Sequence, residues 1–231
     1  MSIPVLARAV GRALDLALPA RCAGCGREGA AICDACVPDL DARLEQPAGV
    51  PIGLPADLPS PLLQLDWCAA YTGTVRRALH ELKYAGEQRL AVPLGRAVAR
   101  RWRRVSAGGD VVVPVPVHPD RYRRRGYDQA VLIAAVAARD LELPMAPILE
   151  RARSTTAQFE LDRATRATNV AGAFRLRAVS GTMRTGSPLA GRWVVLVDDV
   201  VTTGATLAAC ATPLIAAGAV GVSAVTVARE R

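Results

Sequence analysis

The hydrophobic residues of this chain gather in short continuous runs, separated by longer segments with helical spacing. Four runs contain few polar residues, namely Trp67–Tyr71, Val111–Val115, Val194–Val197 and Gly221–Ala228. Runs of this kind are typical of strands that are buried on both faces, as in a parallel sheet. A fifth segment, Ile148–Ala152, also predicts a strand.

Helical spacing of apolar residues appears between these runs, at Thr74–Leu82, Arg89–Val105, Gln129–Arg139 and Leu207–Ala217. Strands that alternate with helices predict parallel β-α-β units with right-handed crossovers. We therefore expect an α/β domain whose parallel sheet is flanked by helices. Ligands of such sheets bind beyond the carboxyl ends of the strands.

The N-terminal quarter of the chain is organised differently. Residues 1–20 predict an amphipathic helix, which packs on its own protein or meets a membrane surface or partner. Residues 21–45 carry four cysteines, and residues 46–64 carry five prolines that block both helix and sheet pairing. We expect a cysteine module, an extended linker and then the α/β domain over residues 65–231.

Composition narrows the range of partners. The chain has 231 residues, of which 51% are hydrophobic, and a net charge of +8. This length accommodates one α/β domain with a small appendage, and the charge favours phosphorylated metabolites, nucleic acid or acidic proteins. No segment has the uninterrupted apolar length of a membrane span or signal peptide, so we expect a cytoplasmic protein.

The cysteines of the N-terminal module form two pairs, Cys22 with Cys25 and Cys33 with Cys36, each with two intervening residues. Two such knuckles can place four thiolates around one tetrahedral ion, which favours a structural zinc. An iron–sulfur cluster, a redox pair or two disulfides are the alternatives, and a cytosolic location disfavours disulfides.

The strand at 194–197 runs directly into Asp198 and Asp199 and then into a turn rich in hydroxyl groups. The turn and the helix that follows it offer backbone N–H groups to a phosphate, and the two acids suit ribose hydroxyls. An ordinary strand-to-helix junction with a threonine cap is the alternative. The candidate sugar-phosphate ligands after the acids are Val200, Val201, Thr202, Thr203, Gly204, Ala205 and Thr206.

Two arginine clusters are the most basic parts of the chain, at 100–104 and 121–125. A solvated helix face is one interpretation, and contact with single-stranded DNA is the other, because aromatic residues beside the arginines can stack on bases. Arg121, Arg123 and Arg124 are the candidate nucleic-acid contacts. His118, which precedes the second cluster, either donates to a phosphate or caps a turn.

Four motifs in this order resemble the ComF competence family. They are the double cysteine knuckle, Val113–His118 with the segment Arg125-Gly126-Tyr127-Asp128-Gln129, a polar segment containing Thr155, Gln158, Arg166, Asn169 and Phe174, and the acid-pair loop. Members of that family join a zinc module to a domain like the type I phosphoribosyltransferases. The resemblance covers essentially residues 22–231 and implies phosphoribosyl pyrophosphate (PRPP) as a ligand.

The resemblance also implies roles for single residues. Asp198 and Asp199 meet the ribose and form the catalytic pair, while the loop that ends at Thr206 binds the 5′-phosphate. Pro116, Val117 and His118 meet the pyrophosphate of PRPP, with Lys83 and Arg125 as further cations. Mg²⁺ is expected with PRPP, and residues 154–169 correspond to a segment that covers the site.

One position departs from the family pattern, which has Asn where this chain has Asp128. A carboxylate there adds negative charge near an expected anion site, so Asp128 either pairs with an arginine or caps the next helix.

The resemblance leaves two functions open. One is transfer of phosphoribosyl to an unknown acceptor, and the other is a non-catalytic role in DNA uptake, as a single-stranded-DNA accessory or PRPP sensor acting with other competence proteins.

Overall fold

A computed structural model of the chain describes residues 19–48, 58–105, 108–151, 172–177 and 189–230. The predicted N-terminal helix, the polar segment 154–169 and most of the loop 178–191 lie outside these residues. So does the middle of the proline-rich linker. The statements below concern the described residues.

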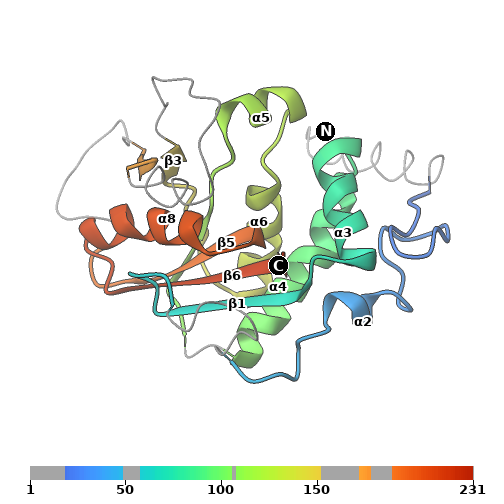
Figure 1. Ribbon diagram of the computed structural model, residues 1–231, viewed down its shortest axis with the longest axis horizontal. Coiled ribbons are helices and arrows are strands. Elements are labelled where there is room, and N and C mark those ends of the chain that lie inside the picture. Colours follow the sequence, from blue (N-terminus) through green and yellow to red (C-terminus); the bar gives the residue numbers. More distant parts are fainter. Residues whose placement is uncertain (1–18, 49–57, 106–107, 152–171, 178–188, 231) are drawn as a thin grey trace, which may run out of the picture.

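The centre of the structure is a four-stranded sheet with the order β1-β6-β5-β2 (Figure 1). Its strands are β1 (Gln64–Ala70), β2 (Val111–Pro114), β5 (Trp193–Val201) and β6 (Gly221–Arg229). All three neighbouring pairs are parallel. The predicted parallel sheet is therefore confirmed, and its carboxyl edge collects the residues that follow β2 and β5.

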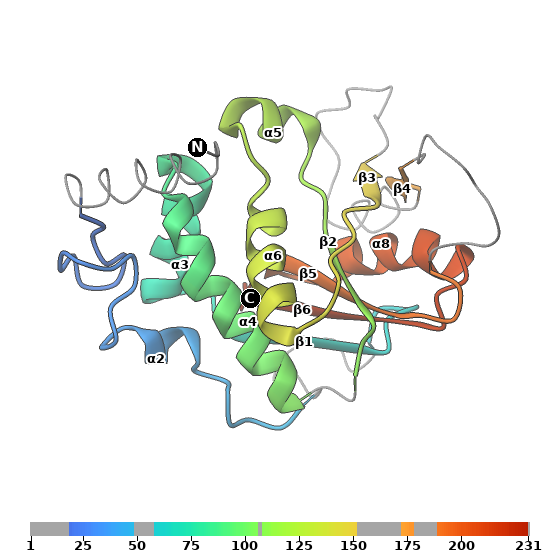
Figure 2. The same cartoon turned by 180° about the vertical axis from the view of Figure 1, so that it is seen from behind.

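Helices cover both faces of the sheet (Figure 1, and Figure 2 from behind). On one face α3 (Gly73–His80), α4 (Ala91–Val105) and α6 (Gln129–Leu141) pack against one set of strand side chains, which includes Val195 and Val197. On the other face α8 (Ala205–Ala216) packs against the alternate set, which includes Val194 and Leu196. The strands are continuously apolar because both of their faces are covered in this way.

Helices α4 and α6 approach each other closely at Gly95. A Cβ atom at this position would lie 2.6 Å from Cβ of Val136 and 2.7 Å from the carbonyl oxygen of Ile133. Any larger residue would push the helices apart. This contact fixes α6, whose first residues reach the candidate site, against the helix that carries the arginine cluster at 100–104.

One strand prediction needs correction, and another is confirmed in a separate sheet. The apolar run at 194–197 was expected to end before the acids, but β5 continues through Asp198 and Asp199 to Val201 because β6 pairs with it along this whole length. The segment at 148–152 was expected to be a strand, and this is confirmed, although the strand lies outside the parallel sheet. It forms β3 (Leu149–Arg151), which pairs antiparallel with β4 (Phe174–Leu176) in a separate two-stranded sheet.

Several short elements connect these layers. The helix predicted at 74–82 ends at His80 and continues as a π-helical turn, η1 (Glu81–Ala85), followed by the 3-10 turn η2 (Gln88–Leu90). The arginine cluster at 121–125 lies in the short helix α5 (Pro119–Arg125), and the cysteine module ends in α2 (Val37–Leu40).

The cysteine module is attached to the α/β domain by polar contacts with α3. The guanidinium of Arg77 donates to the carbonyl oxygens of Ala23 and Gly24, each at 2.7 Å. The hydroxyl of Thr74 donates to the carboxylate of Asp39. These contacts cross from the sheet-covering helix to the module, so the position of the cysteines depends on α3.

Arg101 of α4 makes the most buried of these attachments, with a side chain that is 1% exposed. It holds the Asp66 carboxylate of β1 through two hydrogen bonds of 2.9 and 3.0 Å. Its remaining N–H groups donate to carbonyl oxygens of the module and linker, those of Arg43, Leu44, Gln46 and Pro47. One guanidinium thus ties three segments of the chain together.

The arginine cluster at 100–104 is only partly exposed, because Arg103 and Arg104 face solvent while its central residues do not. Arg101 and Trp102 are buried, and the indole N–H of Trp102 donates to the carbonyl of Gly108. Arg100 pairs with Asp41 at 2.8 Å and Arg104 with Glu45 at 3.3 Å. Both interpretations of this cluster are wrong for its central residues, because the N-terminal module covers them.

None of the helices in the described part of the chain has the length and apolar character needed to cross a bilayer.

Candidate functional site

The two acids of β5 point to opposite faces of the sheet. Side chains alternate along a strand, and Asp199 belongs to the series of Val195 and Val197, whereas Asp198 belongs to the series of Val194 and Leu196. Asp199 is therefore on the α6 side and Asp198 on the α8 side. A ligand held by both acids has to sit over the edge of the strand.

Asp199 is buried, and its Oδ2 atom has two partners from different elements. The Nζ atom of Lys83 lies 3.1 Å away, and the side-chain N–H of Gln129 donates to the same oxygen at 2.7 Å. Lys83 comes from the π-helical turn η1, a rare element that occurs frequently at functional sites. The expected lysine and the expected acid are thus brought together.

Arg125 extends this cluster. Its Nη1 atom donates to the side-chain oxygen of Gln129 at 2.6 Å, and its guanidinium lies 5.1 Å from the ring centre of Tyr84. The order of contacts is Arg125 to Gln129 to Asp199, with Lys83 on the other side of the carboxylate. Four residues from α5, α6, η1 and β5 therefore form one connected polar group.

Asp198 is held by the strand itself, because its Oδ1 atom accepts the backbone N–H of Asp199 at 2.7 Å. Burial raises the pKa of Asp198 well above its usual range, and the neighbouring charge of Asp199 raises it further. The hydrogen bond from Asp199 and the charge of Lys83 act in the opposite direction without cancelling this. A cation or hydroxyl donor at Asp198 would stabilise its ionised form.

The predicted phosphate loop follows β5. Val200 and Val201 still belong to the strand, and Val201 is buried in the core below α8. Thr202 and Thr203 are exposed, and Thr206 lies in the first turn of α8. Because the first N–H groups of a helix have no partner within it, this turn presents donors toward the sheet edge.

Gly204 shapes that turn. It is the N-cap residue of α8 and has no side chain to cap the helix, and the N–H of Ala205 donates to Oγ1 of Thr203 at 3.4 Å. Its φ of +81° is left-handed, and a Cβ atom would lie 2.9 Å from Cγ of Pro59. Any other residue would meet both strain and a steric clash, so the loop geometry depends on glycine at this position.

The second candidate loop, from Val115 to His118, follows β2 at the same edge of the sheet. The carboxylate of Asp128 accepts three backbone N–H groups: that of Val117 at 2.9 Å, that of Ala130 at 2.9 Å and that of Val131 at 3.3 Å. Asp128 therefore caps α6, which is one of the two expected roles, and also anchors the loop. Burial raises its pKa, and these hydrogen bonds partly oppose that rise.

His118 caps the start of α5. Its Nδ1 atom accepts the backbone N–H of Asp120, so this atom is not available to donate to a phosphate. Arg121, Arg123 and Arg124 are exposed on α5, as is Tyr122. Arg123 forms an ion pair with Asp120. The short helix carries these side chains outward beside the Val115–His118 loop.

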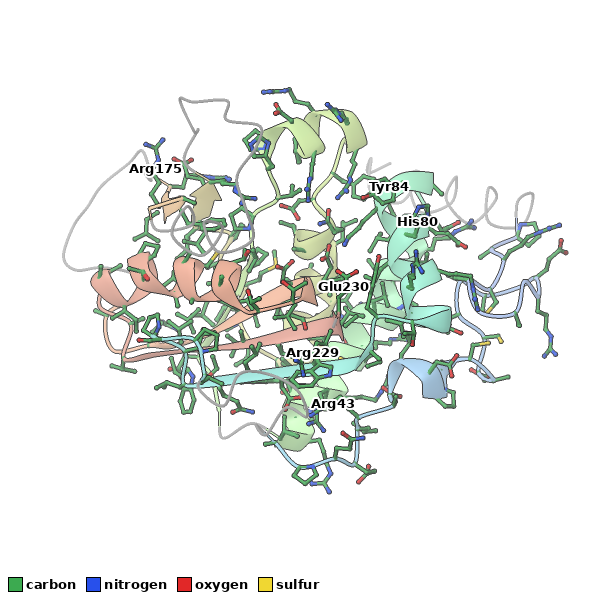
Figure 3. The ribbon with its side chains drawn as sticks, in the orientation of Figure 1. Arg43, His80, Tyr84, Arg175, Arg229 and Glu230 are labelled. Carbon is green, nitrogen blue, oxygen red and sulfur yellow. The ribbon has the colours of Figure 1, made fainter. Side chains whose placement is uncertain are left out.

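A pocket of about 730 Å³ separates α5 and the Val115–His118 loop from the small β3–β4 sheet. Its walls include Tyr122 and Asp128, together with Arg151, Arg175 and Arg177 from the small sheet and its end. Figure 3 labels Arg175 at this sheet. Glu150 pairs with Arg175 at 2.6 Å, so the pocket retains a positive excess next to the candidate PRPP site.

The cysteine module brings together Cys22, Cys25, Cys33 and Cys36, whose sulfur atoms lie within 4.8 Å of one another. Four thiolates at this spacing fit one tetrahedral zinc ion. Cys68 and Cys210 are buried elsewhere, as expected for small hydrophobic residues. The predicted four-cysteine cluster is therefore present and could hold zinc.

The pKa values of two thiols in the cluster shift in opposite directions, because burial and the neighbouring thiols raise the pKa of Cys36 to about 12, whereas the backbone favours the thiolate of Cys22. Burial acts to raise the pKa of Cys22, but hydrogen bonds from the backbone at Cys33, Cys25 and Gly24 outweigh it and lower this pKa to about 6. Gly24 also leaves room, because a Cβ atom there would lie 2.5 Å from the sulfur of Cys36. Glycine is thus required by the close packing of the cluster.

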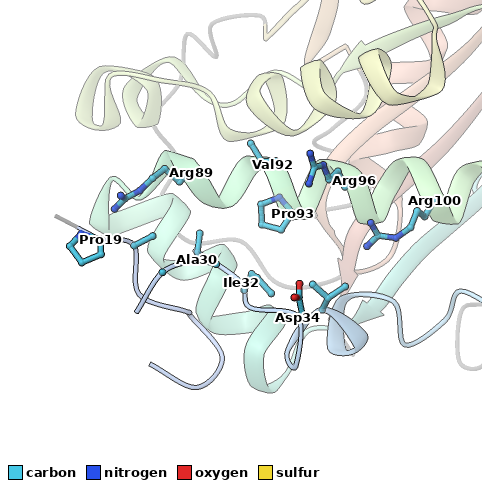
Figure 4. Close-up of a pocket in the computed structure, with 13 residues that line it drawn as sticks. Pro19, Ala30, Ile32, Asp34, Arg89, Val92, Pro93, Arg96 and Arg100 are labelled. Atoms are coloured by element: carbon cyan, nitrogen blue, oxygen red, sulfur yellow. The ribbon is translucent and has the colours of Figure 1, made fainter. Parts of the chain in front are cut away.

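A separate pocket of about 600 Å³ lies between the cysteine module and α4 (Figure 4). Pro19, Ile32 and Asp34 form the module side, and Arg96 and Arg100 are on the helix. It is remote in sequence from the acid pair, and its polar groups are of both signs. We assign no ligand to it.

Sequence reasoning did not assign roles to Gln129, Tyr84 or Arg151, which the structure places at or beside the site. Gln129 directly follows Asp128, the residue that caps α6. Its place in the motif at 125–129 was the one indication in the sequence that it belongs to the site. Tyr84 follows Lys83 but gave no signal of its own. Arg151 gave only the signal of a strand residue.

Comparison with curated proteins finds relatives over most of the chain. DNA utilization protein YhgH of Escherichia coli (strain K12) is 32% identical over 180 residues, which is 75% of each chain. The protein of the same name from Salmonella typhimurium is 31% identical over 205 residues, covering 86% of this chain and 84% of the relative. Competence protein F of Haemophilus influenzae is 39% identical over 99 residues, 42% of this chain and 41% of that protein.

No family model matches the chain. Among solved structures, glutamine PRPP amidotransferase from B. subtilis, complexed with ADP and GMP, is 23% identical with a TM-score of 0.37. That match covers 57% of this chain and 24% of the other. UMP synthase of Leishmania donovani is 18% identical with a TM-score of 0.33, over 65% of this chain and 22% of the other. The matched region is about a quarter of these longer chains.

Proposed function

Because this chain belongs to the ComF competence family, together with DNA utilization protein YhgH, we propose that it binds PRPP and acts in DNA uptake or use. The proposed site is the carboxyl edge of β5 and β2. The names of the relatives support the DNA-related role, and the residues at this edge support the ligand.

The observation that carries the proposal is the contact of Lys83 with Asp199 beside the open turn at Gly204. A buried carboxylate, a lysine and the N–H groups at a helix start are the donors and acceptors that a ribose phosphate requires. They come from distant parts of the sequence and meet at the edge where parallel sheets bind ligands.

In the proposed complex the ribose hydroxyls bind the acids of β5 and the 5′-phosphate binds the Thr202–Thr206 turn. The pyrophosphate lies toward the Val115–His118 loop, with Arg125 and Lys83 as the nearest cations. Asp198 and Asp199 offer the oxygen ligands that Mg²⁺ prefers, although most of its ligands would come from PRPP and water. Mg²⁺ would neutralise charge on the pyrophosphate.

We propose further that the four-cysteine cluster holds a structural zinc. All four ligand positions come from the protein, so no position remains for a reacting group. The module attaches to α3 through Arg77 and Thr74, and the metal would keep its loops in the shape that these contacts require.

Equilibrium dialysis with labelled PRPP tests the ligand. We expect saturable binding in the presence of Mg²⁺, with competition by pyrophosphate and by ribose 5-phosphate, since each fills half of the proposed site. Competition by neither compound would place PRPP elsewhere. Release of pyrophosphate with a panel of bases and amines would then distinguish a transferase from a PRPP sensor.

A second function, contact with single-stranded DNA, is favoured by the exposed arginines of α5 beside the positive pocket at Arg175. Binding to phosphates weakens with salt, with a logarithmic slope of about 0.7 per contact for single strands. We expect the combined substitution of Arg121, Arg123 and Arg124 by glutamine to reduce this slope by about 2. An unchanged slope and affinity would exclude α5 as the contact.

A further inference from the structure

A third pocket lies at the end of β1, outside the proposed PRPP site. It has a volume of about 630 Å³, and its walls include Arg43, Gln46, Trp67, Thr72, Arg229 and Glu230. Figure 3 labels Arg43, Arg229 and Glu230 in this region. We refer to it as the Arg43 pocket. None of these residues contributes to the acid pair or to the loops beside it.

The side chain of Arg43 is buried, but not all of its hydrogen-bond donors have an acceptor. It is 10% exposed, and its nearest carboxylate oxygen, Oδ1 of Asp66, lies 3.7 Å from Nη2. Among the described residues its Nε–H has no hydrogen-bond partner. Its guanidinium stacks on the indole of Trp67, 3.8 Å from the ring centre. Because a buried donor is rarely left unsatisfied, a group from outside the described chain is expected here.

Arg43 shares its nearest carboxylate with another guanidinium. The carboxylate of Asp66 is already held through both oxygens by Arg101. Arg229 adds a third guanidinium, 4.9 Å from the same indole of Trp67. Burial lowers the pKa of Arg43, and the charges of Arg101 and Arg229 lower it further, whereas Asp66 only partly opposes this. The other acid at the pocket, Glu230, is exposed.

The polar groups in the walls match an oxyanion. Thr72 is the N-cap residue of α3, and no side chain caps that helix, so its first N–H groups add to the positive field. A guanidinium fork recognises phosphate or carboxylate through paired N–H groups. The indole of Trp67 is 4% exposed and already covered by two guanidiniums, so it is not open to a stacked base.

From this geometry we propose that the Arg43 pocket is a binding site for a phosphate group, separate from the PRPP site. The group is a free phosphate, inorganic or on a small metabolite, or the terminal 5′-phosphate of a DNA strand. Both present the same oxygens to Arg43. In both cases the phosphate supplies the acceptor that the Nε–H of Arg43 lacks.

The test follows the side-chain N–H resonances of Arg43 and Trp67 in the full-length protein during titration with inorganic phosphate. The Arg43 resonance is assigned by its loss in Arg43→Gln. We expect a saturable shift at both residues and about tenfold weaker binding in Arg43→Gln, followed at Trp67. Glu230→Gln removes a repelling carboxylate and should tighten binding several-fold.

Two variants serve as controls. Arg192→Gln removes an exposed arginine at the opposite end of β5, so it separates a local effect from a change in net charge, and it should leave phosphate binding unchanged. Arg43→Lys keeps the charge but loses the Nε–H, and should also weaken binding. It replaces Arg43→Gln if that variant does not fold.

The two sources of phosphate are distinguished with trinucleotides. Competition by a 5′-phosphorylated trinucleotide, but not by its 5′-hydroxyl counterpart, assigns the site to strand ends. Binding of inorganic phosphate without such competition assigns it to small phosphates. Absence of a saturable shift at Arg43 and Trp67, or equal affinity in Arg43→Gln and the unsubstituted protein, would overturn the proposal.

Discussion

The carboxylate of Asp128 accepts the backbone N–H of Val117 at 2.9 Å and so ties the loop after β2 to the start of α6. The other oxygen of the same carboxylate caps α6. An asparagine could keep the cap through its oxygen, but its amide N–H₂ group could not accept the Val117 N–H. The departure from the family pattern therefore changes what the loop can offer to a ligand.

We expect Asp128→Asn to release the Val117 N–H and remove a negative charge from the proposed pyrophosphate position. Hydrogen exchange at Val117 should accelerate, while the amides of Ala130 and Val131 stay protected. Affinity for PRPP with Mg²⁺ should rise about tenfold, corresponding to about 1.4 kcal/mol. Unchanged exchange at Val117 would show that the hydrogen bond is not maintained in solution.

A stability experiment tests the raised pKa of Asp198. Its pKa is raised in the folded protein, so the ionised form destabilises the fold above the unfolded-state pKa of about 4. Stability contributed by the protonated acid is present at low pH and lost as pH rises. We expect Asp198→Asn to unfold at higher urea than the unsubstituted protein at pH 7, and the difference to shrink toward pH 4.

The same urea series on Asp199→Asn is the matched control, because Asp199 has a cation in contact. Loss of the Lys83 ion pair should destabilise the protein by about 2 kcal/mol, between the values for exposed and buried pairs. If both variants shifted the urea midpoint in the same direction at pH 7, the distinction between the two faces of β5 would be wrong.

Arg101 should contribute to stability and not to nucleic-acid binding. Truncation in Arg101→Ala removes both guanidinium hydrogen bonds from the buried Asp66 carboxylate and the donors to several carbonyl groups, and we expect a loss of about 3–5 kcal/mol. Chemical denaturation measures it. A folded Arg101→Ala variant with normal stability and weakened DNA binding would instead assign this helix to a nucleic-acid surface.

Removal of the proposed zinc should loosen the N-terminal module before the sheet. We expect one zinc per chain by metal analysis, and a chelator should speed proteolysis at the module while protection of the β5 and β6 amides persists. Cys36→Ser should have the same effect, with Cys68→Ser as the matched control outside the cluster. Far less than one zinc per reduced chain would contradict the assignment.

The strands of the parallel sheet could be predicted because a short, uninterrupted apolar run has to be covered on both of its faces, as the central strands of such a sheet are. The end of β5 could not, since Asp198 and Asp199 interrupt the apolar run while β6 continues to pair with the strand. The strand β3 was predicted, but its pairing was not, because its partner β4 is three residues long and gave no signal of its own.

The parts of the candidate sites that could be predicted are those whose residue type and spacing favour one kind of site, as the four cysteines favour a metal site. The arginines were ambiguous, because sequence does not show what covers them. Arg101 is buried by a segment more than fifty residues earlier in the chain, while Arg121 remains exposed on a helix bounded by Pro119 and Gly126. The role of Gln129 was not predicted, because it depends on the contact between α6 and β5.

The most direct test of the proposed function is calorimetric titration of PRPP with Mg²⁺ into the full-length protein and into Asp198→Asn with Asp199→Asn. Arg192→Gln serves as a control away from the site. We predict one saturable site per chain in the unsubstituted and control proteins, and at least a tenfold loss of affinity in the double variant. Absence of binding to the unsubstituted protein, or equal affinity in the double variant, would contradict the PRPP site.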